Sequence, residues 1–137
     1  MNGAQGQRNI PRSILAVVAG ILLNVIGAFI LDEILHLLGV FPPWGQVTYA
    51  PVPYILATSY RAVLGVAGAY LTAKLAPRNP MRHVWVLAGL GLLASIGGVV
   101  AAMTHDLGPI WYSIALAVMA VPLAWLGGWL YVRRPAA

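Results

Sequence analysis

The segment Leu31–His36 (Leu-Asp-Glu-Ile-Leu-His) gathers side chains that can do chemistry at the end of a long apolar run. Its carboxylates, Asp32 and Glu33, are two of the three acidic residues in the chain. Glu33 and His36 are three positions apart, which places a carboxylate and an imidazole on one face of a helix, as in half of a di-iron bundle motif. These groups can bind a metal, accept hydrogen bonds from arginine or transfer a proton.

Two other positions belong with this segment. The third acidic residue, Asp106, follows His105 in a short polar stretch, and Arg61 lies inside another apolar run. Inserting an unpaired arginine into the hydrocarbon layer costs roughly 2.5–3.5 kcal/mol on insertion scales. A carboxylate lowers that cost, because its two oxygens can accept two parallel hydrogen bonds from the planar guanidinium group. We therefore predict that Arg61 pairs with Asp32 or Glu33.

The composition predicts an integral membrane protein with the lipid bilayer as its surroundings. Of the 137 residues, 61% are apolar and 8% are charged, against roughly a quarter charged in soluble domains. The net charge of +5 comes from residues at the ends of apolar runs and not from a basic face with interleaved aromatics, so we expect no nucleic-acid partner. The chain has no cysteine, which excludes disulfides and thiolate metal sites.

The elements that must position these residues are four apolar segments. We predict an all-α fold, a four-helix transmembrane bundle, because each segment is long enough to cross a hydrocarbon layer of about 30 Å. A cleaved signal peptide is the competing interpretation of the first segment, but that segment is long for one and lacks a cleavage pattern. The predicted spans are 14–38, 54–75, 83–103 and 109–132, with a short, mobile polar tail at 1–13 and a basic tail at 133–137.

Basic residues predict the orientation of the bundle. Every lysine and arginine except Arg61 falls on one side, whereas every acidic residue falls on the other, which satisfies the positive-inside rule with both termini cytoplasmic. We expect the inner (plasma) membrane as the location. The residues on the basic side are Arg8, Arg12, Lys74, Arg78, Arg82, Arg133 and Arg134.

In two of the predicted spans, polar and small residues form a stripe along one helix face, and such a face is not expected to contact lipid. Polar and small residues recur at steps of three and four in both, the pattern on which membrane helices approach closely. We therefore predict that the second and third spans are central in the bundle. The stripes are Tyr54, Thr58, Arg61, Gly65, Gly68 and Thr72 in the second span, and Gly91, Ser95, Gly98 and Ala102 in the third.

Four pieces of the chain carry a family resemblance. They are Tyr60-Arg61, the stretch 68–77 (Gly-Ala-Tyr-Leu-Thr-Ala-Lys-Leu-Ala-Pro), the stretch 107–112 (Leu-Gly-Pro-Ile-Trp-Tyr) and the stretch 124–128 (Ala-Trp-Leu-Gly-Gly). Together they resemble a group of small bacterial four-span inner-membrane proteins for which no activity is established. The resemblance implies the four-span topology and assigns no functional residues.

The chemistry of the cluster leaves several interpretations open. Arg61 with Asp32 or Glu33 can be a clamp between two helices, or it can line an outward-facing site for an anion or a proton. Loops too short to form a soluble domain, and the absence of a complete catalytic constellation, favour a non-enzymatic small subunit or accessory component that needs no cofactor and docks on a membrane-protein partner. The outward-facing site favours a homo-oligomeric transporter or channel, with His36, His105 and Asp106 as further binding residues. A third is an outer-leaflet metalloenzyme, whose divalent metal would be bound by Glu33, His36, His105 and Asp106.

Overall fold

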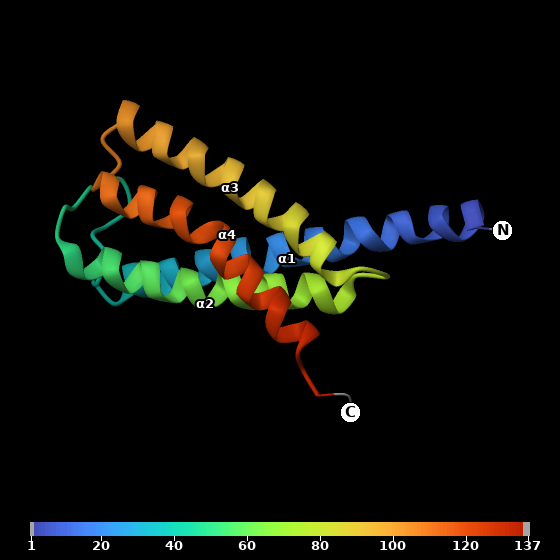
Figure 1. Cartoon of the computed structure of the whole chain (residues 1–137). Coiled ribbons are helices and arrows are strands. Elements are labelled where there is room, and N and C mark those ends of the chain that lie inside the picture. Colours follow the sequence, from blue (N-terminus) through green and yellow to red (C-terminus); the bar gives the residue numbers. More distant parts are fainter. Residues whose placement is uncertain (1, 136–137) are drawn as a thin grey trace.

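A computed structural model describes the backbone of residues 2–135 and the side chains of residues 10–135. Over this part of the chain the structure is all-α, with four helices and no strand (Figure 1). The predicted fold class is confirmed, and the helix bounds lie within a few residues of the predicted spans except at the N-terminus. The helices are α1 (Asn2–Leu37), α2 (Pro51–Leu75), α3 (Pro80–Thr104) and α4 (Ile110–Val132).

Three of the four helices are long and apolar enough to span a membrane. They are the Ile10–Leu37 part of α1, the whole of α3 and the whole of α4. Large apolar side chains point outward on all of them, for example Phe29, Leu93 and Val118, each more than half exposed. Such surface is stable in lipid and not in water. The chain is therefore a membrane protein.

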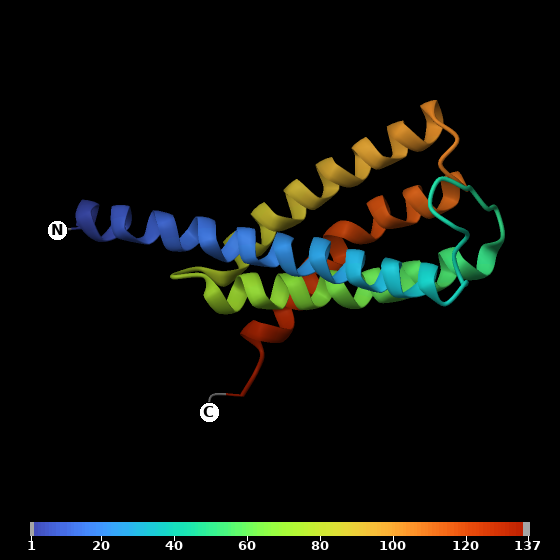
Figure 2. The same ribbon diagram turned by 180° about the vertical axis from the view of Figure 1, so that it is seen from behind.

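Helix α2 lies at the centre of the arrangement, since it packs against α1, α3 and α4. The beginning of α1, the end of α4 and the α2–α3 turn (residues 76–79) lie at one end of the bundle, here called the terminal end (Figures 1 and 2). The connections 38–50 and 105–109 lie at the opposite end, here called the loop end. Helix α3 runs beside α4 but diverges from α1 toward the loop end, and α1 touches α3 only slightly.

Close backbone approach joins α1 to α2. A Cβ on Gly68 would lie 2.8 Å from the carbonyl oxygen of Gly20, so neither glycine has room for a side chain. One turn away, the Thr72 hydroxyl donates a hydrogen bond of 2.9 Å to the carbonyl oxygen of Ala16 and is fully buried. The second-span stripe is thus a helix-packing face, as predicted.

The prediction for the third span is wrong. A Cβ on Gly91 or Gly98 would meet nothing within 4 Å, so these glycines bring no helix close. The close packing against α2 that was predicted for the third span is made by α4. Gly127 of α4 lies directly against the backbone of Val66 and the methyl group of Ala69. The small-residue stripe of α3 is left facing open space.

Within the stretch predicted as a polar tail, α1 already begins at Asn2 and passes through Pro11. A helix nucleated by the apolar run extends through Ala4, Gln5, Gln7 and Arg8, which have high helix propensity, although Gly3, Gly6 and Pro11 in the same stretch disfavour it. At the other end of the bundle, Pro109 is the N-cap of α4 and precedes its first helical residue.

Candidate functional site

The predicted partner of Arg61 is Asp32. The Nη2 atom of Arg61 on α2 donates to the Oδ2 atom of Asp32 on α1 at 2.6 Å. The neighbouring Tyr60 hydroxyl donates to the other carboxylate oxygen, Oδ1. The Arg61 and Asp32 side chains are 29% and 21% exposed. Both carboxylate oxygens are therefore bonded by α2, and the predicted pairing is confirmed.

Glu33 and His36 are used in a different way. The Glu33 carboxylate accepts a hydrogen bond of 3.1 Å from the indole nitrogen of Trp44. The Nδ1 atom of His36 lies 2.7 Å from the carbonyl oxygen of Pro42, and its ring centroid is 4.0 Å from that of Trp44. Both side chains thus hold the α1–α2 connection onto the end of α1.

His105 and Asp106 stay apart from this group. They lie exposed between α3 and α4, beside a shallow hollow that also includes Tyr49. Over the described part of the chain, no three His, Cys, Asp or Glu side chains come close enough to hold a metal ion together. The structure does not gather Glu33, His36, His105 and Asp106 into one ligand set.

An aromatic cluster at the loop end was not recognised from the sequence. The Tyr54 hydroxyl donates to the carbonyl oxygen of Thr48 at 3.0 Å, and its ring lies 5.0 Å from that of Tyr112. Gly108, with a φ of 125°, passes against the same tyrosine and would have no room for a Cβ. The cluster ties the two connections of the loop end together. The only sequence signal for it is that Phe41, Tyr54, Trp111 and Tyr112 fall in or next to the two connections.

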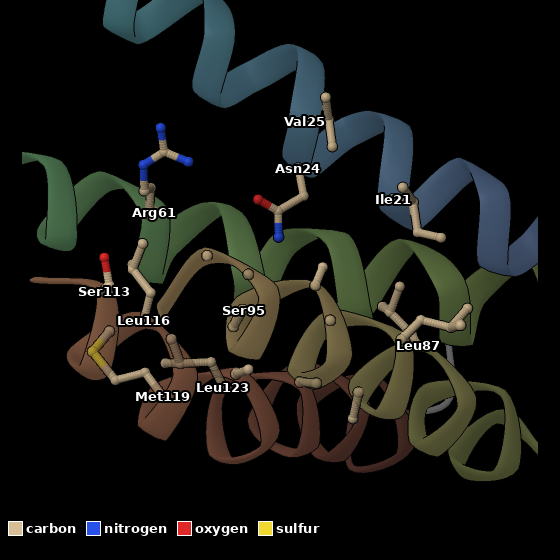
Figure 3. Close-up of a pocket in the computed structure, with 18 residues that line it drawn as sticks. Ile21, Asn24, Val25, Arg61, Leu87, Ser95, Ser113, Leu116, Met119 and Leu123 are labelled. Carbon is tan, nitrogen blue, oxygen red and sulfur yellow. The ribbon is translucent and has the colours of Figure 1, made fainter. Parts of the chain in front are cut away.

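A cavity of about 460 Å³ lies between the four helices on the side where α3 leaves α1 (Figure 3). We call it the α1–α3 crevice. Arg61 and Asn24 border it from α2 and α1, and Ser95 lies in it from α3. Exposed residues such as Val25 and Leu90 form its edge, which therefore opens to the surface of the bundle.

The crevice explains where the α3 stripe points. Gly91, Ser95 and Gly98 all line it, and α4 contributes residues such as Ser113 that carried no sequence signal. The Nε atom of Arg61 is buried and has no hydrogen-bond partner among the described residues. A buried donor without an acceptor costs about 1–3 kcal/mol. The crevice thus has unfilled, mostly apolar volume, and Arg61 at its border keeps one buried donor without a partner among the described residues.

Comparisons of the chain with family profiles, with curated protein sequences and with solved structures give no match. The resemblance to small bacterial four-span proteins stays a prediction.

Proposed function

We propose that the protein crosses the inner (plasma) membrane four times, with both termini in the cytoplasm. Helices α1, α3 and α4 can each span, and α2 connects the loop end of α1 with the terminal end of α3, so it must run back across the same layer. Lysine and arginine gather at the terminal end, and the three acidic residues lie at or near the loop end. The positive-inside rule then assigns the terminal end to the cytoplasm.

Within that membrane the protein acts as a non-enzymatic small subunit or accessory component that binds a partner's transmembrane helix in the α1–α3 crevice. The observation that carries this proposal is the open small-residue stripe of Gly91, Ser95 and Gly98 along a cavity of about 460 Å³. Membrane helices associate through such faces, because small residues let two backbones approach closely. The partner helix would present small residues to the stripe.

The test is to fill the crevice without changing the charge. Gly98→Leu places a branched side chain in it, whereas Gly97→Leu is a matched control, because Gly97 does not line the cavity and also has free space at its Cβ. We expect a complex in mild detergent that is larger than the monomer, is lost with Gly98→Leu and is retained with Gly97→Leu. A complex that persists in both variants contradicts the proposal. A complex that contains only copies of this chain would mean that the crevice binds a second copy and not a different protein.

A homo-oligomeric transporter or channel is the second candidate. It is favoured by one observation: Arg61, which pairs with Asp32, borders the same cavity as Asn24 and two serines. Polar groups within a membrane protein commonly line ion or proton paths. Proteoliposomes with an internal pH-sensitive dye separate the candidates. Proton flux that disappears in a folded Asp32→Asn/Arg61→Gln variant supports transport, and no flux above protein-free vesicles supports the accessory role.

A further inference from the structure

A second cavity, of about 700 Å³, lies at the terminal end between the beginning of the apolar part of α1 and the beginning of α3. Its wall is apolar, with Val17 and Val18 from α1 and Val86 from α3. Its rim is basic, because Arg78 precedes α3 and Arg82 lies in the first turn of that helix. We call it the basic pocket.

The positive charge of this pocket is not balanced by the protein. Arg78 and Arg82 are exposed, and the one ion pair among the described side chains is Arg61–Asp32. Asp106 lies 24 residues beyond Arg82 at the far end of α3, a distance of about 36 Å along the helix. The amino end of α3 adds a partial positive charge, and Asn79, its N-cap, makes no side-chain capping bond.

The pocket therefore offers two different surfaces to one ligand. Guanidinium groups suit phosphate oxygens, because each can donate two parallel hydrogen bonds. The valine wall cannot form hydrogen bonds with a soluble anion, whereas an acyl chain can pack against it. It leads to Ile21 and Leu90, which also line the α1–α3 crevice, so the apolar path continues along the gap between the two helices.

We propose that the basic pocket binds an anionic phospholipid, with its phosphate on Arg78 and Arg82 and one acyl chain along the wall formed by Val17, Val18 and Val86. Basic pockets between membrane helices recognise anionic head groups in this way. The site lies at the opposite end of the bundle from Arg61 and does not depend on a partner helix or on transport.

The test is the affinity of the purified full-length protein for phosphatidylglycerol and for phosphatidylcholine with the same acyl chains, measured by native mass spectrometry. Arg78→Gln/Arg82→Gln is the site variant. Arg133→Gln/Arg134→Gln is the matched control, since it removes the same charge from the terminal end, and its side chains lie over Trp129 and Tyr131.

We expect the site variant to bind phosphatidylglycerol about 25-fold more weakly, from about fivefold for each of the two basic residues near an anionic lipid. The control variant should change by less than threefold. Equal losses in both variants, or equal binding of phosphatidylcholine by the wild type, would overturn the proposal, because the attraction would then be general or absent.

A third variant separates a lipid from a free phosphate. Val86→Trp obstructs the apolar wall and leaves the arginines in place. We expect it to weaken phosphatidylglycerol binding several-fold and expect inorganic phosphate at millimolar concentration not to displace the lipid. Unchanged lipid binding by Val86→Trp, together with displacement by phosphate, would show an anion site only and would refute the acyl-chain assignment.

Discussion

The ion pair between α1 and α2 can be tested by a double-mutant cycle on Arg61 and Asp32. Arg61→Gln removes one donor to Asp32 but leaves the Tyr60 hydroxyl on the other carboxylate oxygen. Asp32→Asn leaves Arg61 charged, with only a neutral oxygen to accept its hydrogen bond. Each single change therefore leaves an uncompensated charge between two membrane helices, whereas the double change leaves none.

The expected loss of unfolding free energy follows from how far the Arg61–Asp32 pair is exposed. Removing one partner of a fully buried ion pair costs roughly 3–5 kcal/mol, and an exposed pair contributes about 0–1 kcal/mol. The Arg61 and Asp32 side chains are 29% and 21% exposed, so the pair falls between these limits. We expect each single variant to lose about 2 kcal/mol of unfolding free energy and the double variant no more than either single one, a coupling energy of about 2 kcal/mol.

The assay is reversible unfolding in mixed micelles with increasing sodium dodecyl sulfate, followed by circular dichroism. Glu33→Gln is the control, because Glu33 is bonded to Trp44 and not to Arg61. It should change stability by less than about 0.5 kcal/mol and should add independently to Arg61→Gln. Additive effects of Arg61→Gln and Asp32→Asn would refute the clamp between the two helices.

Two other predictions concern packing and topology. Gly68→Ala should destabilise the bundle by about 1–3 kcal/mol, because its Cβ would lie 2.8 Å from the Gly20 carbonyl oxygen; Gly97→Ala, with free space at its Cβ, should be neutral or stabilising by up to about 1 kcal/mol. The same unfolding assay measures both, and equal effects of the two substitutions would contradict the close crossing. In whole cells, Thr48→Cys should react with an impermeant maleimide from outside and Asn79→Cys should react only after lysis, so the reverse pattern would overturn the proposed orientation.

Much of the fold could be predicted from the sequence because the signals are local. Apolar runs of membrane-spanning length, with prolines and polar residues between them, specify four helices without knowledge of their neighbours. The pairing of Arg61 with an acid was also predictable, since the chain has three acidic residues and two of them lie at the right depth. Whether Asp32 or Glu33 binds Arg61 depends on how α1 is rotated about its own axis relative to α2. No local sequence pattern specifies that rotation.

What could not be predicted depends on contacts between distant segments. The stripe on α3 has the same spacing as the stripe on α2, yet only α2 uses its glycines for close packing. The difference arises because Gly127 on α4 lies against α2, and α4 therefore occupies the place that α3 was expected to fill. Similarly, no pattern in the sequence shows that Trp44 folds back onto Glu33 and His36.

The most direct test of the α1–α3 crevice as a helix-binding site is photo-crosslinking in intact membranes from a benzophenone side chain at Ser95, which lines the crevice. We predict one discrete protein adduct that disappears when Gly98→Leu is combined with the probe and persists with Gly97→Leu. Adducts to lipid alone, or a protein adduct unaffected by Gly98→Leu, would contradict the account.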